Sequence, residues 1–254
     1  MLDGRPRDRS FLPLRRVGFG ALFLLLMGSS SFVQAAGDGV ILLHGLCRTK
    51  ASMNKMAARM TDEGYVVVNV EYASRQGKIA ELSEQVVGGA LRDPRLKDCK
   101  TIHFVTHSLG GILVRKYFKD NPQERLGRVV MLSPPNQGSE VVDRIGHWTL
   151  FKWINGPAGG QLGTGPDSVP NSLGPVSFEL GVITGDRSIN WINSSMIKGN
   201  DDGKVSVEHS KVEGMDDHVV VHTSHPYVMK NRKVIALAAR FLESGSFAAE
   251  EANP

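Results

Sequence analysis

One serine lies where a predicted strand passes into a predicted helix, in the segment Thr106–Gly111, whose sequence is THSLGG. An alcohol is a weak nucleophile until it is exposed beside a base and close to donors for an oxyanion. A tight strand-to-helix turn exposes the serine in this way. Because residues two before and two after it crowd each other, the turn favours the pattern G-x-S-x-G. Gly110 supplies the second glycine and Thr106 replaces the first, so Ser108 is the candidate nucleophile.

Backbone donors for an oxyanion are predicted at two places. The first predicted strand runs into His44-Gly45-Leu46, and the loop after such a strand commonly supplies one N–H, while the residue after the nucleophile supplies the other. We therefore assign these donors to the amides of Leu46 and Leu109. His44 is expected to hold the loop rather than to take part in the chemistry.

A base and a supporting acid follow the serine in the order serine, acid, histidine. His225 lies on the loop between the last predicted strand and the last predicted helix, where its imidazole could take the Ser108 proton. Asp202 precedes a glycine in a sequence that suits a turn after a strand. Its carboxylate would fix the imidazole tautomer and stabilise the imidazolium.

Other residues could fill the same roles. His222 is the main alternative base, although it falls inside the last predicted strand. Asp201 and Asp186 are alternative acids. Several His and Asp residues between 209 and 222 have no recognisable metal-ligand spacing, so we predict neither a metal site nor a cofactor.

The elements that must position these residues alternate along the chain. Strands are predicted at residues 39–43, 65–70, 101–105, 128–132, 179–184 and 218–222, and helices at 52–63, 79–91, 109–119 and about 226–242. Strands separated by helices of this length indicate βαβ units and a mainly parallel sheet of about six strands, with helices on both faces. The pattern predicts an α/β fold in one domain, residues 37–243, with residues 244–254 as a flexible tail.

One long segment interrupts the alternation. Residues 137–177 are rich in Gly, Pro, Asn and Ser and contain one apolar patch, with Trp148, Phe151 and Trp153. Segments of this kind are usually functional or mobile. We expect a lid-like insertion whose three aromatic residues bind substrate. Packing of the insertion onto the sheet is the alternative explanation for them.

The N-terminus has the features of a secretory signal peptide. Two arginines, Arg15 and Arg16, precede the apolar run 17–27, and small residues follow as far as Ala36. Residues 1–36 are therefore predicted to direct export, giving a periplasmic or secreted protein. The alternative is an uncleaved anchor in the inner membrane.

The net charge of +4 gives little support for a nucleic-acid partner. Residues 1–36 hold five arginines against two aspartates, which leaves a charge of about +1 for the rest. We expect a small-molecule or lipid ester as the partner, with transient contact to a membrane or lipid surface. The sequence identifies no partner protein.

Five motifs in order resemble the bacterial lipase and esterase branch of the α/β-hydrolases, which includes secreted triacylglycerol lipases and lipase-like acylhydrolases. They are His44–Leu46, Thr106–Gly110, Pro134–Ser139, Asp202–Val205 and His225, within residues 38–242. The resemblance implies a minimal six-strand α/β-hydrolase fold. The calcium-binding aspartate that follows the histidine in one secreted lipase group is replaced by Pro226-Tyr227, so no structural calcium is predicted.

These motifs favour a serine hydrolase that cleaves carboxylic esters, with lipid-like acyl esters as the expected class, through an acyl-enzyme. The same residues could serve a thioesterase or an acyltransferase, and a non-catalytic binding protein on this scaffold is the alternative from another class.

The expected fold also bears on Cys47 and Cys99. Cys47 follows the carboxyl end of one parallel strand, and Cys99 precedes the amino end of its expected neighbour. A strand of five or six residues separates such ends by roughly 17–20 Å, whereas a disulfide needs Cα atoms within about 7 Å. Two free thiols are therefore predicted.

Overall fold

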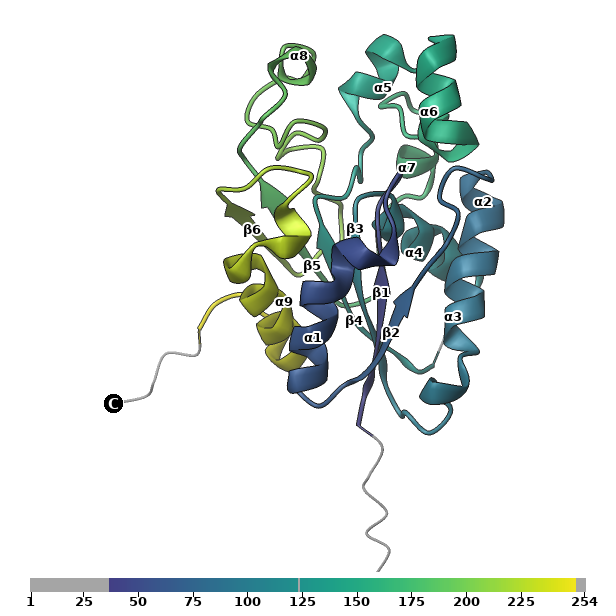
Figure 1. The fold of residues 1–254 in the computed structure, drawn as a ribbon, viewed down its shortest axis with the longest axis vertical. Coiled ribbons are helices and arrows are strands. Elements are labelled where there is room, and N and C mark those ends of the chain that lie inside the picture. Colours follow the sequence, from purple (N-terminus) through teal and green to yellow (C-terminus); the bar gives the residue numbers. More distant parts are fainter. Residues whose placement is uncertain (1–36, 123, 250–254) are drawn as a thin grey trace, which may run out of the picture. The chain divides into compact units, whose positions relative to one another are not determined.

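A parallel sheet of six strands is the framework of the computed structural model, which describes residues 37–122 and 124–249. The strand order is β2-β1-β3-β4-β5-β6 and every neighbouring pair is parallel (Figure 1). The strands are β1 Gly39–Leu43, β2 Val66–Val70, β3 Ile102–His107, β4 Leu126–Leu132, β5 Leu180–Gly185 and β6 Asp217–Val221. The predicted fold class is confirmed, and each predicted strand is present within two residues of its expected bounds. The predicted signal peptide, residues 1–36, lies outside the described residues.

Helices cover both faces of this sheet (Figure 1). One face carries α1 Asn54–Asp62 and α9 Arg232–Ser244. The other carries α4 Leu109–Asp120 and a continuous helical segment made of α2 Ile79–Leu82, the π-helical turn η2 Ser83–Gly88 and α3 Gly89–Leu91. Short 3-10 turns complete the layers: η1 Lys50–Met53, η3 Pro94–Leu96 and η4 Val228–Lys230.

Two apolar cores result from the alternation of side chains along the strands. In β1, Val40 and Leu42 pack with the α1 and α9 layer, whereas Ile41 and Leu43 pack with the α4 layer. All four side chains are fully buried. A strand buried on both faces reads as a continuous apolar run, which is why the sequence predicts β1 well.

The last helix begins later than its apolar pattern predicts. Residues 226–231 contain the turn η4, and α9 starts at Arg232. The Asn231 side chain accepts hydrogen bonds from the amides of Lys233 and Val234, which satisfies two donors of the first helical turn. The capping residue, rather than the first apolar residue, sets this boundary.

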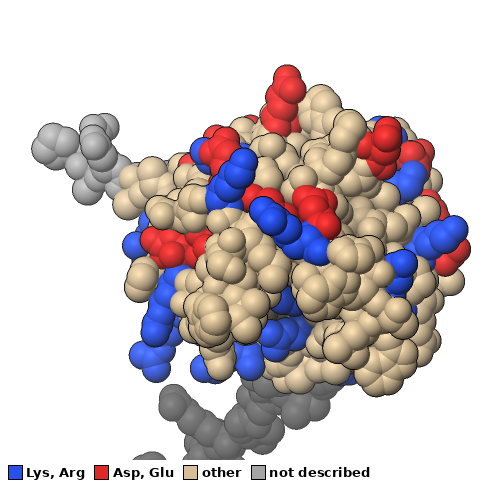
Figure 2. All heavy atoms as spheres, turned by 90° about the horizontal axis from the view of Figure 1, so that it is seen from above, with Lys and Arg blue, Asp and Glu red and all other residues tan. Residues whose placement is uncertain are grey.

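The insertion contains regular structure that its composition does not reveal. It holds α5 Glu140–Ile145, α6 Thr149–Gly160 and α7 Val169–Ser172, and α8 Trp191–Ser194 follows β5. Helix α6 is kinked at Gly156, with φ 66°, directly before Pro157. Figure 1 shows α5, α6 and α8 beyond the carboxyl ends of the strands. Figure 2 looks onto this end and shows broad uncharged areas between charged side chains.

The expected flexible tail needs a correction for its described part, residues 244–249. Phe247 is 5% exposed and its ring lies 5.0 Å from that of Phe241. A Cβ on Gly181 would be 2.6 Å from Phe247, so the glycine in β5 leaves the space that this ring fills. The aromatic contact, together with the bond from the Phe247 amide to Asp217, holds the segment against the sheet.

Both cysteines are free thiols, Cys47 exposed and Cys99 buried. The pairing of β1 with β3 confirms the strand arrangement from which this was predicted, because Gly39 is opposite Ile102 and the two thiols flank opposite ends of the pair. Within residues 37–122 and 124–249, no helix has the length and apolar character needed to cross a bilayer.

Gly110 permits the close approach of α4 to β1, and its replacement should destabilise the fold. In Gly110→Ala the new methyl would lie 3.0 Å from the Leu43 carbonyl and 3.1 Å from that of His44, both backbone atoms. We expect the free energy of unfolding, measured in urea, to fall by about 1–3 kcal/mol. Gly89→Ala is the matched control, since nothing lies within 4 Å of that position in α3. It should be neutral or stabilising by up to about 1 kcal/mol, and equal losses in both variants would contradict the argument.

Candidate active site

Ser108 occupies a strained turn between β3 and α4. Its φ is 51° and its ψ −118°, a conformation that residues with a Cβ rarely adopt. Its amide donates to the carbonyl of Leu132 in β4, over 2.9 Å, and Leu109 begins α4 directly afterwards. The turn therefore holds the serine at the carboxyl edge of the sheet, as the sequence predicts.

Thr106 is accommodated because Gly111, in the first turn of α4, has no side chain. The threonine is fully buried, and a Cβ on Gly111 would lie 3.3 Å from its hydroxyl oxygen. The missing side chain at Gly111 leaves room for the threonine hydroxyl. This explains the departure from G-x-S-x-G.

Asp202 and His225 form a buried acid–imidazole pair. The Asp202 Oδ2 lies 2.8 Å from the His225 Nδ1, and the two residues are 0% and 4% exposed. The His225 amide also donates to the Asp202 carbonyl over 2.9 Å. A hydrogen bond from Nδ1–H to the carboxylate leaves Nε2 as the acceptor nitrogen of the ring.

Hydrogen bonds keep the buried Asp202 carboxyl ionised. Desolvation on its own would raise its pKa, but the coulombic interaction and hydrogen bond with His225, together with bonds from Ser133 and the Val205 amide, bring the pKa below its ordinary value. The amides of Lys204 and Val205 both donate to Oδ1, over 3.0 and 2.9 Å. The turn that contains Asp202 and Gly203 therefore supplies backbone donors to the carboxylate.

The alternative residues have other partners. Asp201 accepts from the Ser194 hydroxyl and the Gly203 amide, each over 2.7 Å. Asp186 lies 3.0 Å from the Nδ1 of His222, which follows β6 and has a side chain 75% exposed. The two alternatives, one base and one acid, therefore pair with each other at the surface rather than with Ser108.

His107 fixes the loop that carries His225. Its Nε2 lies 3.1 Å from the His225 carbonyl, and the two rings are 4.8 Å apart. Burial, and then coulombic interactions with His225, Arg48 and Lys204, hold the pKa of His107 well below its usual range. His107 is therefore neutral, and its Nε2–H donates to that carbonyl.

The loop after β1 lies against the serine turn. A Cβ on Gly45 would be 2.6 Å from His107 and 3.2 Å from the Ser108 Cβ, so only glycine allows this approach. His44 is buried and stacks on Tyr72, with ring centroids 4.1 Å apart, and the Tyr72 hydroxyl donates to the His44 carbonyl. His44 thus has the structural position expected from the sequence.

The amides of Leu46 and Leu109, the predicted oxyanion donors, have no hydrogen-bond acceptor among residues 37–122 and 124–249. Leu109 is the first residue of α4, where backbone donors are left without partners inside the helix. Both amides therefore retain the capacity to donate to a ligand.

A cavity of about 420 Å³ brings the candidate residues together. Ser108, His107 and His225 line it on one side, and the insertion contributes apolar residues. Of the three predicted substrate-binding aromatics, Phe151 lines the cavity. Trp148 and Trp153 are 54% and 77% exposed and do not line it.

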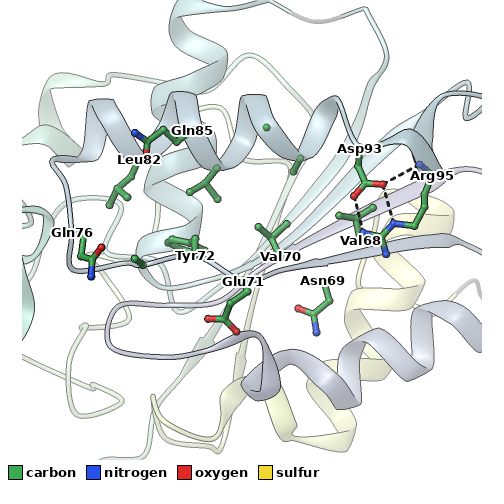
Figure 3. Close-up of a pocket in the computed structure, with 14 residues that line it drawn as sticks. Val68, Asn69, Val70, Glu71, Tyr72, Gln76, Leu82, Gln85, Asp93 and Arg95 are labelled. Carbon is green, nitrogen blue, oxygen red and sulfur yellow. Dashed lines mark hydrogen bonds and ion pairs between the residues drawn. The ribbon is translucent and has the colours of Figure 1, made fainter.

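A second cavity of about 520 Å³ lies at the β2 edge, between that strand and the segment from α2 to α3 (Figure 3). Its charged residues include Asp93 and Arg95, which form an ion pair, with Oδ2 and Nη2 2.7 Å apart. No Ser, Cys or His is among the described residues that line it. It therefore has no counterpart of the candidate nucleophile and base that line the first cavity.

Arg115 and Asn136 anchor the start of the insertion, and sequence reasoning does not identify Arg115. Arg115 in α4 is buried and donates to the carbonyl and side-chain oxygens of Asn136, over 2.8 and 3.1 Å, while burial lowers its pKa to about 10. Gly138 has φ 89°, and a Cβ there would be 2.0 Å from the Gly163 carbonyl. The motif Pro134–Ser139 thus shapes the backbone at the mouth of the cavity.

The His and Asp residues between 209 and 222 are engaged separately. His209 pairs with Glu140, and Asp216 accepts from the Leu180 amide. In the part of the chain that the structure describes, no group of three or more His, Cys, Asp or Glu residues could hold a metal ion.

Solved structures match this chain over most of its length. The mature form of Bacillus licheniformis lipase BlEst2 superposes with a TM-score of 0.66 and 16% identity, covering 82% of this chain and 92% of the lipase. A lipase-esterase related protein from Clostridium acetobutylicum gives a TM-score of 0.55 and 16% identity, covering 82% and 95% of the two chains. The chain has the α/β-hydrolase fold.

A third match places the same fold within a longer protein. Phospholipase PlaB from Legionella pneumophila gives a TM-score of 0.65 and 17% identity, and the match covers 84% of this chain and 60% of the phospholipase.

A family model matches part of the sequence. The model of the palmitoyl protein thioesterase family matches residues 39–162, just under half of the chain. That region includes the loop after β1, the serine turn and the first part of the insertion, and it ends before Asp202 and His225. None of the curated proteins matches the sequence.

The buried His107 should make stability fall with decreasing pH. An unfolded histidine takes up a proton below about pH 6.5, whereas folded His107 stays neutral to lower pH, so the unfolded state binds more protons. The free energy of unfolding should therefore decline between about pH 7.5 and pH 5. His44, His103 and His218 act in the same direction.

His107→Gln keeps a donor for the His225 carbonyl. In this variant the free energy of unfolding, measured in urea, should decline less between about pH 7.5 and pH 5 than in the wild-type protein. His147→Gln changes an exposed histidine and serves as the control with the original slope. An unchanged slope in His107→Gln would refute the neutral assignment.

Proposed function

We propose that this protein is a serine hydrolase of acyl esters, in which Ser108, His225 and Asp202 act as nucleophile, base and supporting acid. The observation that carries the proposal is the buried 2.8 Å contact between Asp202 and His225, beside a cavity that both Ser108 and His225 line. The likeness of the fold to lipases and esterases supports it.

In the first step the Ser108 Oγ attacks the acyl carbon while the His225 Nε2 takes the hydroxyl proton. The carbonyl π electrons move to the oxygen, and the amides of Leu46 and Leu109 donate to the resulting oxyanion. The imidazolium is stabilised by Asp202, which remains ionised. When the intermediate collapses, the leaving oxygen or sulfur receives the proton from His225, and an acyl-Ser108 ester remains.

In the second step a water molecule attacks the acyl-enzyme. His225 takes its proton, the oxyanion forms again at the same two amides, and collapse releases the carboxylic acid. The proton returns to the Ser108 Oγ. Atoms and charges balance without a metal or a cofactor, and the remaining requirement is that water reaches the acyl-enzyme.

A thioester is the second candidate substrate. The match of residues 39–162 to the palmitoyl protein thioesterase family supports it, because that family's name describes cleavage of a fatty-acyl group from a protein. The same residues serve both bonds, since the leaving sulfur also departs with the proton from His225.

The apolar side of the cavity supports a hydrocarbon acyl group. Six apolar side chains of the insertion line it: Val141, Val142, Ile145, Phe151, Ile154 and Leu162. We propose that this part of the insertion forms the acyl pocket and that α6 acts as its lid. Leu150 and Trp153, also on α6, remain exposed and could meet a lipid surface.

Substitution of the acid distinguishes the proposed triad from its alternatives. Asp202→Asn should lower kcat for p-nitrophenyl hexanoate by about 10⁴-fold, because the imidazole would take the wrong tautomer. Asp186→Asn, the matched control at the other acid–imidazole pair, should change kcat less than threefold. A large loss in Asp186→Asn with none in Asp202→Asn would overturn the assignment.

A fluorophosphonate probe tests the nucleophile without knowledge of the substrate. The probe should label the wild-type protein, Asp202→Asn slowly, and Ser108→Ala and His225→Ala not detectably. Mass spectrometry should locate the adduct at Ser108. Labelling at another residue, or no labelling of the wild-type protein, would contradict a Ser108 enzyme.

The acyl pocket predicts a chain-length effect that depends on Phe151. In Phe151→Ala, kcat/KM for p-nitrophenyl esters should fall more steeply for decanoate than for acetate, since a longer chain loses more apolar contact. Trp153→Ala removes a larger aromatic that does not line the cavity, and the decanoate-to-acetate ratio should stay constant with soluble substrate. A changed ratio in Trp153→Ala alone would favour a different pocket.

A further inference from the structure

The charges of the cavity are all of one sign. Arg48, from the loop after β1, and Lys204, from the turn after Asp202, line it together with Ser108 and His225. No Asp or Glu is among the described residues that line it. The hydrolysis mechanism uses neither cationic side chain, so the pair requires a separate explanation.

Neither cation has a partner in the part of the chain that the structure describes. Among residues 37–122 and 124–249, no hydrogen bond or ion pair involves the guanidinium of Arg48 or the ammonium of Lys204. Nearby carboxylates are occupied elsewhere: Asp143 accepts from Thr164, Glu140 pairs with His209, and Asp201 accepts from Ser194.

Each of the two positive charges makes the other less favourable. The pKa of Lys204 is lowered, first by desolvation and then by Arg48, while Cys47 and Asp202 act in the opposite direction. The side chain lies in a concave position, where many protein atoms surround it although its surface still meets solvent. Positive groups gathered in such a position raise the local concentration of an anion.

The lining residues divide by chemistry. The insertion supplies the apolar side described above, whereas Arg48, Lys204, Asn190 and Asn193 supply cationic and amide side chains. If the acyl chain contacts the apolar side chains, the cationic and amide side chains are available to the part of the substrate beyond the scissile bond.

We propose that the preferred substrates are acyl esters or thioesters whose leaving group carries an anionic substituent, which Arg48 and Lys204 bind. The inference rests on the proposed function and adds the substrate class. A phosphate, sulfonate or carboxylate could fill the site, since each accepts charge-assisted hydrogen bonds from a guanidinium and an ammonium.

Two synthetic esters of the same shape test the proposal. The hexanoyl ester of 4-hydroxybenzenesulfonate has an anionic leaving group, and that of 4-hydroxybenzenesulfonamide has a neutral one at pH 7. The ratio of their kcat/KM values measures anion recognition apart from the chemical step. Wild-type protein should favour the sulfonate, and added salt should reduce the preference.

Arg48→Gln and Lys204→Gln should each lower this ratio about tenfold, and Lys204→Arg should restore most of it. Lys198→Gln is the matched control, since this exposed lysine lies in the same connection between β5 and β6 without lining the cavity. Its ratio should equal that of the wild-type protein. Thermal unfolding checks that each variant is folded.

The outcomes separate this proposal from the proposed function. Hydrolysis of both esters at equal rates, or a ratio unaffected by Arg48→Gln and Lys204→Gln, would overturn the anion site and leave the Ser108 hydrolase intact. If Ser108→Ala hydrolyses the neutral ester as fast as wild-type protein, the proposed function fails. In p-nitrophenyl hemisuccinate the anionic group is on the acyl part. If the wild-type protein prefers this ester to its methyl ester, and Lys204→Gln loses the preference, the anion binds on the acyl side and its assignment to the leaving group is overturned.

Discussion

The left-handed backbone of Ser108 is the constraint on which the site depends. Its φ of 51° costs of the order of 1–3 kcal/mol for a residue with a Cβ, so neighbouring structure must hold it. The bond from its amide to the Leu132 carbonyl fixes the turn to β4. Absent side chains at Gly45 and Gly110 then allow the loop after β1 and helix α4 to close around it. The conformation of one serine therefore requires glycine both in the loop after β1 and in α4.

The acid–imidazole pair is stable for a different reason. Asp202 is fully buried, and a buried carboxylate is costly unless several donors satisfy it. Two consecutive amides and the imidazole supply those donors, and His107 holds the His225 backbone from the other side. The surface pair Asp186–His222 has similar geometry without this enclosure, because the His222 side chain is 75% exposed. Burial and its satisfied hydrogen bonds distinguish the two pairs more than distance does.

The parallel sheet could be predicted from sequence because strands buried on both faces are continuous apolar runs, as in residues 39–43. The order of Ser108, Asp202 and His225 also could be predicted, since it depends on loops at strand ends. The helices of the insertion could not, because glycines and Pro157 hide α6 within a low-propensity composition. Nor could the roles of Arg115 and His107, which depend on what each side chain meets across the fold. Trp148 and Trp153 look like pocket residues by type, but the helical rotation turns Phe151 inward and leaves them exposed.

Cys47 joins two parts of the molecule that the chain keeps far apart. It too has a left-handed backbone, with φ 56°, one residue after Leu46, and its thiol lies 3.3 Å from the Ile154 carbonyl in α6. This contact links α6 to the loop after β1, which also carries Leu46, the proposed oxyanion donor. Under the proposed function, displacement of α6 would therefore shift this loop, and the entry of a ligand would be mechanically coupled to the position of the proposed donor.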